Sequence, residues 1–177
     1  ILSMPRSLPD VMMVGLNERD PRFHDIYRVE IATGQRKLVR ENKEEVGAWV
    51  FDNEGQLRLA WKEKPGGGGD LLRVGLQGLE PIASATFEED ITPLQFHPDG
   101  RQCYISTNIG ADIDLARLML LDVETGTWTF VEQDPEGEVD VFVFIAATMT
   151  DQRGFLQFVF TLALFQKGSV DTVGGKK

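Results

Sequence analysis

The sequence predicts an all-β protein made of antiparallel β-propeller blades, with the propeller incomplete. Residues 93–131 have the pattern of four short strands in about forty residues, which is the size of one blade. Turn glycines recur about every 45 residues: Gly34, Gly78 and Gly126 in one set, and Gly55 and Gly100 in another. No segment shows helical periodicity. We therefore predict about three four-stranded blades and a C-terminal β-hairpin in one domain.

The first predicted blade covers roughly residues 5–46. Its strands are expected at residues 11–16, 26–31 and 36–40, because apolar residues alternate there with polar ones. A polar insert at residues 17–25 separates the first two strands, and the turn at residues 32–35 contains Gly34.

The second predicted blade covers roughly residues 47–92. Its strands are expected at residues 48–51, 57–61, 71–74 and 79–83. Asp52-Asn53-Glu54-Gly55 is the first turn, and the glycine-rich residues 65–69 are expected to form a flexible hairpin tip. A phosphate-binding loop is excluded there, because neither Gly-Lys-Ser/Thr nor a helix follows.

The third predicted blade covers roughly residues 93–138. Leu94 and Phe96 run into His97-Pro98-Asp99-Gly100, a turn sequence. Cys103 and Ile105 share one face of the next strand, and residues 118–123, apolar on both faces, are expected to be buried on both. The remaining residues, 139–177, are predicted to form an apolar hairpin, with strands at 139–150 and 155–166, and a tail.

Composition and charge restrict the class of partner. The 177 residues contain 42% hydrophobic and 26% charged residues, and the net charge is −10. Nucleic acids and anionic membranes attract clustered Lys and Arg, so neither is expected as a partner. The first residues lack the charged n-region and the apolar core of a signal peptide, and the longest apolar run near the end, residues 155–165, is too short to span a bilayer. We expect a soluble protein, with the cytoplasm as the favoured compartment, and a chain that is a processed product or a fragment.

Two stretches resemble known families. Residues 94–105, LQFHPDGRQCYI, are similar to the repeat of TolB-type propellers, except that His97 stands where that repeat usually has Ser. Residues 14–34, VGLNERDPRFHDIYRVEIATG, resemble the N-terminal propeller of bacterial serine peptidases of the prolyl oligopeptidase (S9) family. The resemblance covers roughly residues 5–140. It implies a propeller of about seven blades that shields and filters access to an α/β-hydrolase domain.

The resemblance carries over no catalytic residue. The serine nucleophile of an α/β-hydrolase lies in a Gly-x-Ser-x-Gly elbow, which this sequence lacks. The chain by itself is therefore not assigned as an enzyme, and its parent is expected to be a serine peptidase. The first hypothesis is a non-catalytic propeller portion whose partners are a hydrolase domain of the same parent chain or a peptide substrate. The alternative is a stand-alone TolB-like protein-binding module that forms a homo-oligomer.

Few side chains stand out as candidate site residues. Arg19, Asp20 and Arg22 lie in a charged loop that could touch a neighbouring domain or a ligand; a local ion-pair network explains them equally well. No cofactor and no metal site are expected. His24 and His97 are isolated, and the Asp112–Asp114 pair lacks the remaining ligands of a calcium loop. The adjacent pairs Glu44-Glu45 and Glu88-Glu89 point to opposite faces of a strand and cannot converge on one substrate.

Overall fold

The computed structural model describes residues 1–5, 7–110, 115–132, 140–150 and 156–165. Within these residues the chain has strands and no helix. The strands in chain order are β1 (Val11–Asp20), β2 (Phe23–Glu30), β3 (Arg36–Arg40), β4 (Ala48–Phe51), β5 (Leu57–Glu63), β6 (Gly69–Gly75), β7 (Gly78–Ala85), β8 (Ile91–Phe96), β9 (Gln102–Thr107), β10 (Arg117–Asp122), β11 (Trp128–Glu132), β12 (Asp140–Thr150) and β13 (Leu156–Phe165). The described residues therefore contain no helix that is long and apolar enough to cross a membrane.

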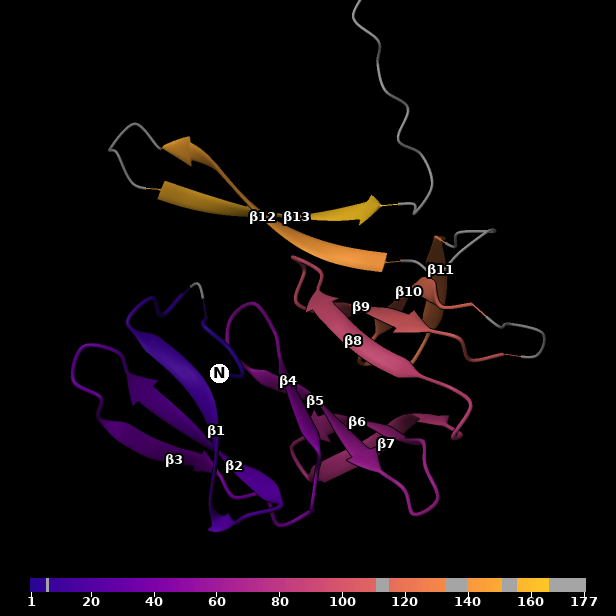
Figure 1. Cartoon of the computed structure of the whole chain (residues 1–177), viewed down its shortest axis with the longest axis horizontal. Helices are drawn as coiled ribbons and strands as arrows, with labels where there is room; N and C mark the ends of the chain where they lie inside the picture. Colours follow the sequence, from indigo (N-terminus) through magenta and orange to yellow (C-terminus); the bar gives the residue numbers. More distant parts are fainter. Residues whose placement is uncertain (6, 111–114, 133–139, 151–155, 166–177) are drawn as a thin grey trace, which may run out of the picture.

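The strands form antiparallel sheets that follow the order of the sequence (Figure 1). The first sheet is β1-β2-β3, the second is β4-β5-β6-β7, and the third is β8-β9-β10-β11. None of the sheets closes on itself. The prediction of an all-β chain with incomplete propeller blades is confirmed. The C-terminal hairpin is also present, because β12 pairs with β13 in an antiparallel two-stranded sheet.

The first sheet contains the three strands expected at residues 11–16, 26–31 and 36–40, and it lacks the fourth strand of a four-stranded blade. A short N-terminal segment takes the place of the missing strand. The backbone N–H of Leu2 donates to the carbonyl of Met13 at 2.8 Å, and the N–H of Met13 donates to the carbonyl of Ser3 at 2.8 Å. This single bridge is too short to count as a strand, but it places Ser3 beside β1 where β4 and β8 stand in their own sheets.

The polar insert expected at residues 17–25 is instead part of a long hairpin. β1 continues to Asp20, and β2 already begins at Phe23. An irregularity in the register between Leu16 and Asp20 lets the strand continue past the apolar stretch. Polar side chains alone do not identify a loop. Here the backbones of β1 and β2 pair with each other, and Arg19 bonds to Asp25 across the hairpin, so the segment is extended.

Side-chain alternation explains the burial of the third sheet. Cys103 and Ile105 are fully buried on one face of β9, while Tyr104 between them is only half-buried. Leu118 and Leu121 lie on opposite faces of β10, and both are buried. The predictions for these two strands are therefore confirmed.

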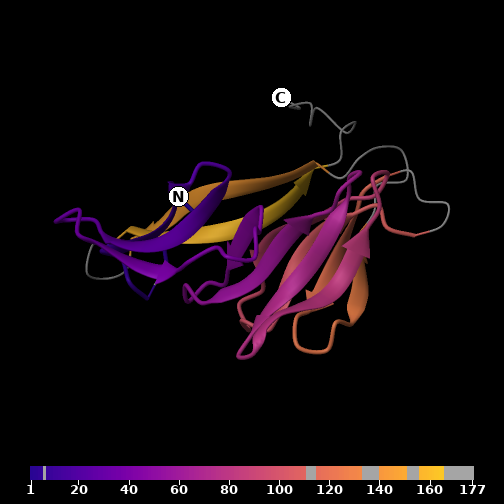
Figure 2. The same cartoon turned by 90° about the horizontal axis from the view of Figure 1, so that it is seen from below.

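Hydrophobic packing joins neighbouring sheets face to face (Figure 2). One cluster of buried residues lies between the second and third sheets and contains Leu59, Leu71, Ala85, Ile91, Phe96, Cys103, Ile105, Leu121 and Val123. A smaller cluster joins Ile26 of β2 to the second sheet and contains Val46, Trp49, Ala60 and Leu72 as well. These two clusters link the first sheet to the second and the second sheet to the third, so these three sheets stack as blades do.

The repeated turns have similar backbone geometry in the first and third sheets. Gly34 and Gly126 have φ of 70° and 71°, and each donates its N–H to a carbonyl four residues earlier at 2.8 Å. The left-handed conformation explains why glycine occurs at both positions. Gly78 departs from this pattern: it pairs with Gly75 across a shorter turn, and its φ is 133°.

The glycine-rich hairpin tip expected between β5 and β6 is present, and its last glycines pack against the segment that follows β7 and against Trp61. A Cβ on Gly68 would lie 2.3 Å from the carbonyl oxygen of Ala85, and Gly68 has φ of 70°. A Cβ on Gly69 would lie 2.4 Å from the ring of Trp61. The glycines allow a close approach of backbone to backbone and to an aromatic ring.

Candidate functional site

The predicted loop residue Arg19 is part of a buried polar junction near the turn end of the β1–β2 hairpin. Its Nε and Nη2 atoms each donate to a carboxylate oxygen of Asp25 at 2.9 Å. Asp25 is 2% exposed, and it also accepts the backbone N–H of Asn42 at 2.7 Å. The Arg19 guanidinium, and then the Asn42 N–H, hold the pKa of Asp25 below its usual range.

The same junction fastens the linker that leads to the second sheet. The Asn42 side chain donates to the carbonyl of Val46 at 2.8 Å and accepts the N–H of Val46 at 2.9 Å. Arg19 Nη2 donates in addition to the carbonyl of Asn42 at 2.9 Å. Asn42 and Val46 are both buried, so these bonds form away from water. The arrangement therefore sets the position of the second sheet relative to the first.

Asp20 and Arg22, the other two predicted site residues, pair with each other at the tip of the hairpin. Asp20 accepts the backbone N–H of Arg22 at 3.0 Å and its Nη2 at 3.0 Å. This pair, with the guanidinium bond first in importance, lowers the pKa of Asp20. The Arg22 side chain is 67% exposed and lies 3.7 Å from Glu45. The predicted local ion-pair network is thus present, and the contact with a neighbouring domain or a ligand stays a prediction.

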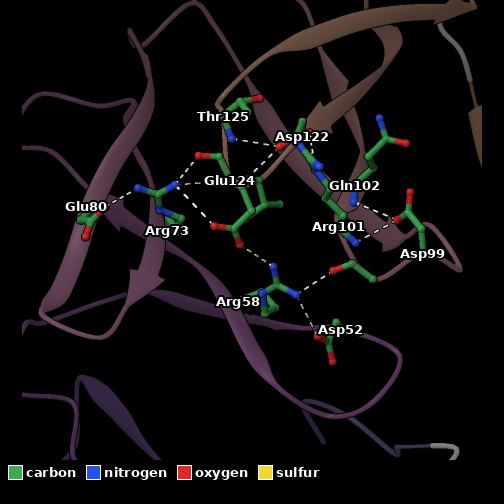
Figure 3. Close-up of polar contacts among 12 residues, drawn as sticks. Asp52, Arg58, Arg73, Glu80, Asp99, Arg101, Gln102, Asp122, Glu124 and Thr125 are labelled. Atoms are coloured by element: carbon green, nitrogen blue, oxygen red, sulfur yellow. Dashed lines mark hydrogen bonds and ion pairs between the residues drawn. The ribbon is translucent and has the colours of Figure 1, made fainter.

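A second polar cluster joins the second and third sheets at their turns (Figure 3). Arg58 of β5 bonds to Asp52 at 3.2 Å, to the carbonyl of Gly100 at 2.6 Å and to Glu124 at 3.0 Å. The Arg58 guanidinium also lies over the ring of Phe96, 5.6 Å from its centre. One side chain of the second sheet therefore holds two different turns of the third sheet.

Arg73 of β6 reinforces the same junction from the neighbouring strand. Its Nη1 donates to the backbone carbonyl of Glu124, and its Nη2 pairs with Glu80 of β7 (Figure 3). The Glu80 hydrogen bond raises the pKa of the Arg73 guanidinium. Sequence reasoning did not single out Arg58, Arg73 or Glu124. The available signal was an arginine flanked by apolar residues on each of two strands, in Leu57-Arg58-Leu59 and in Leu72-Arg73-Val74.

The structure contains one serine–lysine contact that the sequence did not indicate. Lys64 Nζ donates to the hydroxyl of Ser84, and it also pairs with Asp70 at 2.7 Å. The bond from Lys64 lowers the pKa of Asp70. A serine nucleophile needs a neighbouring base that can take its proton. Lys64 instead donates to Ser84 and is held by a carboxylate, so the pair does not form a catalytic dyad.

The other sequence candidates do not converge on a site. His97 lies 3.1 Å from Asp99 within its own turn, and His24 is exposed on β2. Glu44 pairs with Arg40 at 2.6 Å, and Glu89 accepts the N–H of Thr86 at 2.9 Å. Residues 112 and 114, the Asp-x-Asp pair, lie outside the described residues. Within the part of the chain that the structure describes, no cluster of His, Cys, Asp or Glu could hold a metal ion.

Comparison with known proteins finds two relatives. The chain is 34% identical to dipeptidyl aminopeptidase BIII of Pseudoxanthomonas mexicana over 134 residues, which are 74% of this chain and 19% of that enzyme. It is 33% identical to dipeptidyl peptidase family member 6 of Caenorhabditis elegans over 60 residues, which are 34% of this chain and 8% of that protein. The chain thus spans less than a fifth of either relative. No protein-family model matches the chain.

Proposed function

We propose that this chain is a non-catalytic propeller portion of a peptidase of the S9 family, because it is homologous over most of its length to dipeptidyl aminopeptidase BIII, an S9 peptidase. In this role it shields a hydrolase domain and filters which peptides reach it. The homology to dipeptidyl aminopeptidase BIII carries the proposal. The sequence supports the non-catalytic part, because it contains no Gly-x-Ser-x-Gly elbow.

The polar junctions between sheets support a role as a rigid screen. Arg58 bonds to turns of the third sheet, and Arg19 with Asp25 fastens the linker to the second sheet. Such bonds fix the angle between neighbouring blades. A propeller with fixed blade angles keeps the width of the passage through which peptides would reach the hydrolase domain. Arg22, exposed at the tip of the β1–β2 hairpin, is the group that we propose to contact the hydrolase domain or a peptide substrate.

The proposal is tested by measuring what the chain does alone and what it belongs to in its source cells. The purified 177-residue chain should release no product from dipeptidyl-p-nitroanilide substrates. An antibody against this chain should detect a product several-fold larger than 19.8 kDa, which a fluorophosphonate probe labels at its active serine. Hydrolysis by the chain alone, blocked by a serine-directed inhibitor, would overturn the non-catalytic assignment.

A second candidate is a stand-alone protein-binding module that associates with copies of itself. Exposed apolar residues at the outer edge of the first sheet favour it: Leu38 and Val39 of β3 are 46% and 51% exposed, and Ile31 before them is 46% exposed. Unpaired strand edges with apolar side chains promote pairing between chains. This function predicts a native product near 19.8 kDa that light scattering shows to be an oligomer. A large product labelled by the fluorophosphonate probe would exclude it.

A further inference from the structure

A pocket of about 320 Å³ lies between β7 of the second sheet and β9 to β11 of the third. Ile82, Ile109, Met119 and Trp128 provide its apolar walls, and Arg117 is the charged residue that lines it. Small-molecule sites in proteins have volumes from about 300 Å³ upward and combine apolar walls with a few polar groups. None of the residues of the Arg58 and Arg19 junctions lines the pocket.

The hydroxyl groups in the pocket already have partners. Thr107 Oγ1 donates to the carbonyl of Asp90 at 2.6 Å and accepts the N–H of Ile109 at 3.1 Å. The Ser84 hydroxyl is bonded to Lys64. These bonds fix the end of β9 and the start of the following loop. Among the polar side chains that line the pocket, Arg117 is therefore the one whose N–H groups are available to a ligand.

Arg117 differs from the other arginines that the structure describes. The structure describes nine arginines, and the eight other than Arg117 each form an ion pair with a carboxylate. For Arg117, no carboxylate of the described residues lies within salt-bridge distance. Its Nη2 donates to the carbonyl of Ile109 at 2.7 Å, which fixes the guanidinium at the pocket, and its Nε is buried without a partner among the described residues. A buried charged donor that lacks an acceptor is costly.

We propose that this pocket binds a small carboxylic acid, with the carboxylate paired to Arg117 and the apolar body against Met119 and Trp128. Guanidinium and carboxylate match in geometry and form short, charge-assisted bonds. Burial of a hydrocarbon body against the apolar walls contributes favourably to the free energy of binding. The pocket volume equals about ten water molecules in the liquid, which suits a ligand of roughly that many non-hydrogen atoms. This site does not depend on the proposed peptidase role.

The test compares an acid with its neutral counterpart on the complete 177-residue chain. The ¹⁵N-labelled chain is titrated with 4-phenylbutyrate, with hexanoate and, as the uncharged control, with 4-phenylbutyramide. The readout is the indole N–H signal of Trp128, assigned with the variant Trp128→Phe. Trp49 and Trp61 provide internal reference signals, because neither lines the pocket. We expect both acids to shift the Trp128 signal saturably and the amide to bind about tenfold more weakly, the loss of one charge-assisted bond.

Two variants locate the charge that is responsible. Arg117→Gln should reduce binding of 4-phenylbutyrate to the level of the amide. The matched control is Arg101→Gln, which removes an exposed arginine paired with Asp122 at 2.6 Å and should leave binding unchanged. Equal binding of acid and amide to the unmodified chain would overturn the proposal, even if Arg117→Gln failed to fold. Unchanged acid binding by folded Arg117→Gln, or no saturable shift of Trp128 with either acid, would overturn it as well.

Discussion

Replacing Asp25 by Asn tests whether a buried ion pair holds the first sheet to the linker. The substitution keeps the shape of the side chain but removes its charge and one of the two oxygens. Asp25 is 2% exposed and accepts two 2.9 Å bonds from Arg19 and a 2.7 Å bond from the N–H of Asn42. Hydrogen bonds to charged groups contribute about 1.5–3 kcal/mol each, and the Arg19 side chain is partly in water.

We therefore expect Asp25→Asn to lower the free energy of unfolding by about 2 kcal/mol at neutral pH. For a chain of this size that corresponds to a fall of about 4–8 °C in the melting temperature. Urea unfolding followed by circular dichroism gives the free energy, and calorimetry gives the melting temperature. The exposed-pair variant Asp20→Asn is the control, and it should be close to the unmodified chain because water screens that pair.

The pH dependence gives a sharper test of the same reasoning. The native pKa of Asp25 is lowered, so the unfolded state binds its proton first as the pH falls. The stabilisation by Asp25 is complete above the unfolded pKa of about 3.9, and it is lost as the pH falls through the lower native pKa. The difference between Asp25→Asn and the unmodified chain should shrink over that range. A difference of the same size at neutral pH and in strong acid would refute the ion-pair explanation.

Three further predictions concern the junction between sheets, the glycine tip and the cysteine. Arg58→Ala should destabilise the chain by about 2–3 kcal/mol in urea unfolding, because it leaves the buried Asp52 without its ion pair; an unchanged midpoint would contradict this. Gly68→Ala should destabilise it by more than about 1 kcal/mol through its positive φ and the contact with Ala85, whereas Gly66→Ala, which meets nothing, should cost less. Burial raises the pKa of Cys103 to about 12, so iodoacetamide should label the native chain far more slowly than the urea-unfolded chain. Equal labelling rates would show that Cys103 is accessible.

Local pattern predicted much of the fold. The alternation at Cys103 and Ile105 indicated which face of β9 is buried, and the turn at residues 97–100 indicated where β8 ends. Alternation is a property of adjacent residues, so it can be read without knowledge of distant parts of the chain. The hairpin at residues 17–25 was predicted as a polar insert because its side chains are mostly polar, although the backbones of β1 and β2 pair there. The bond from the Asn42 N–H to Asp25 joins this hairpin to a distant part of the sequence.

The candidate site residues were harder to predict from the sequence than the strands, because their contacts join distant parts of the chain. Arg19, Asp20 and Arg22 could be named from their cluster of charge, and the sequence left a contact surface and an internal network as equal alternatives. Arg58 and Arg117 could not be named. The carbonyl of Gly100 reaches Arg58, and Ile82 of β7 comes to line the same pocket as Arg117, only because the second and third sheets pack together.

The sequence by itself determined the strands, the turns and their recurrence, because side-chain alternation and glycine conformation act over a few neighbouring residues. It also carried the resemblance to S9 peptidases that the comparison with dipeptidyl aminopeptidase BIII supports. Only the tertiary structure decided which charges neutralise one another. Arg58 reaches Gly100 and Glu124 because the second and third sheets meet at their turns, and Arg117 has no carboxylate partner among the described residues.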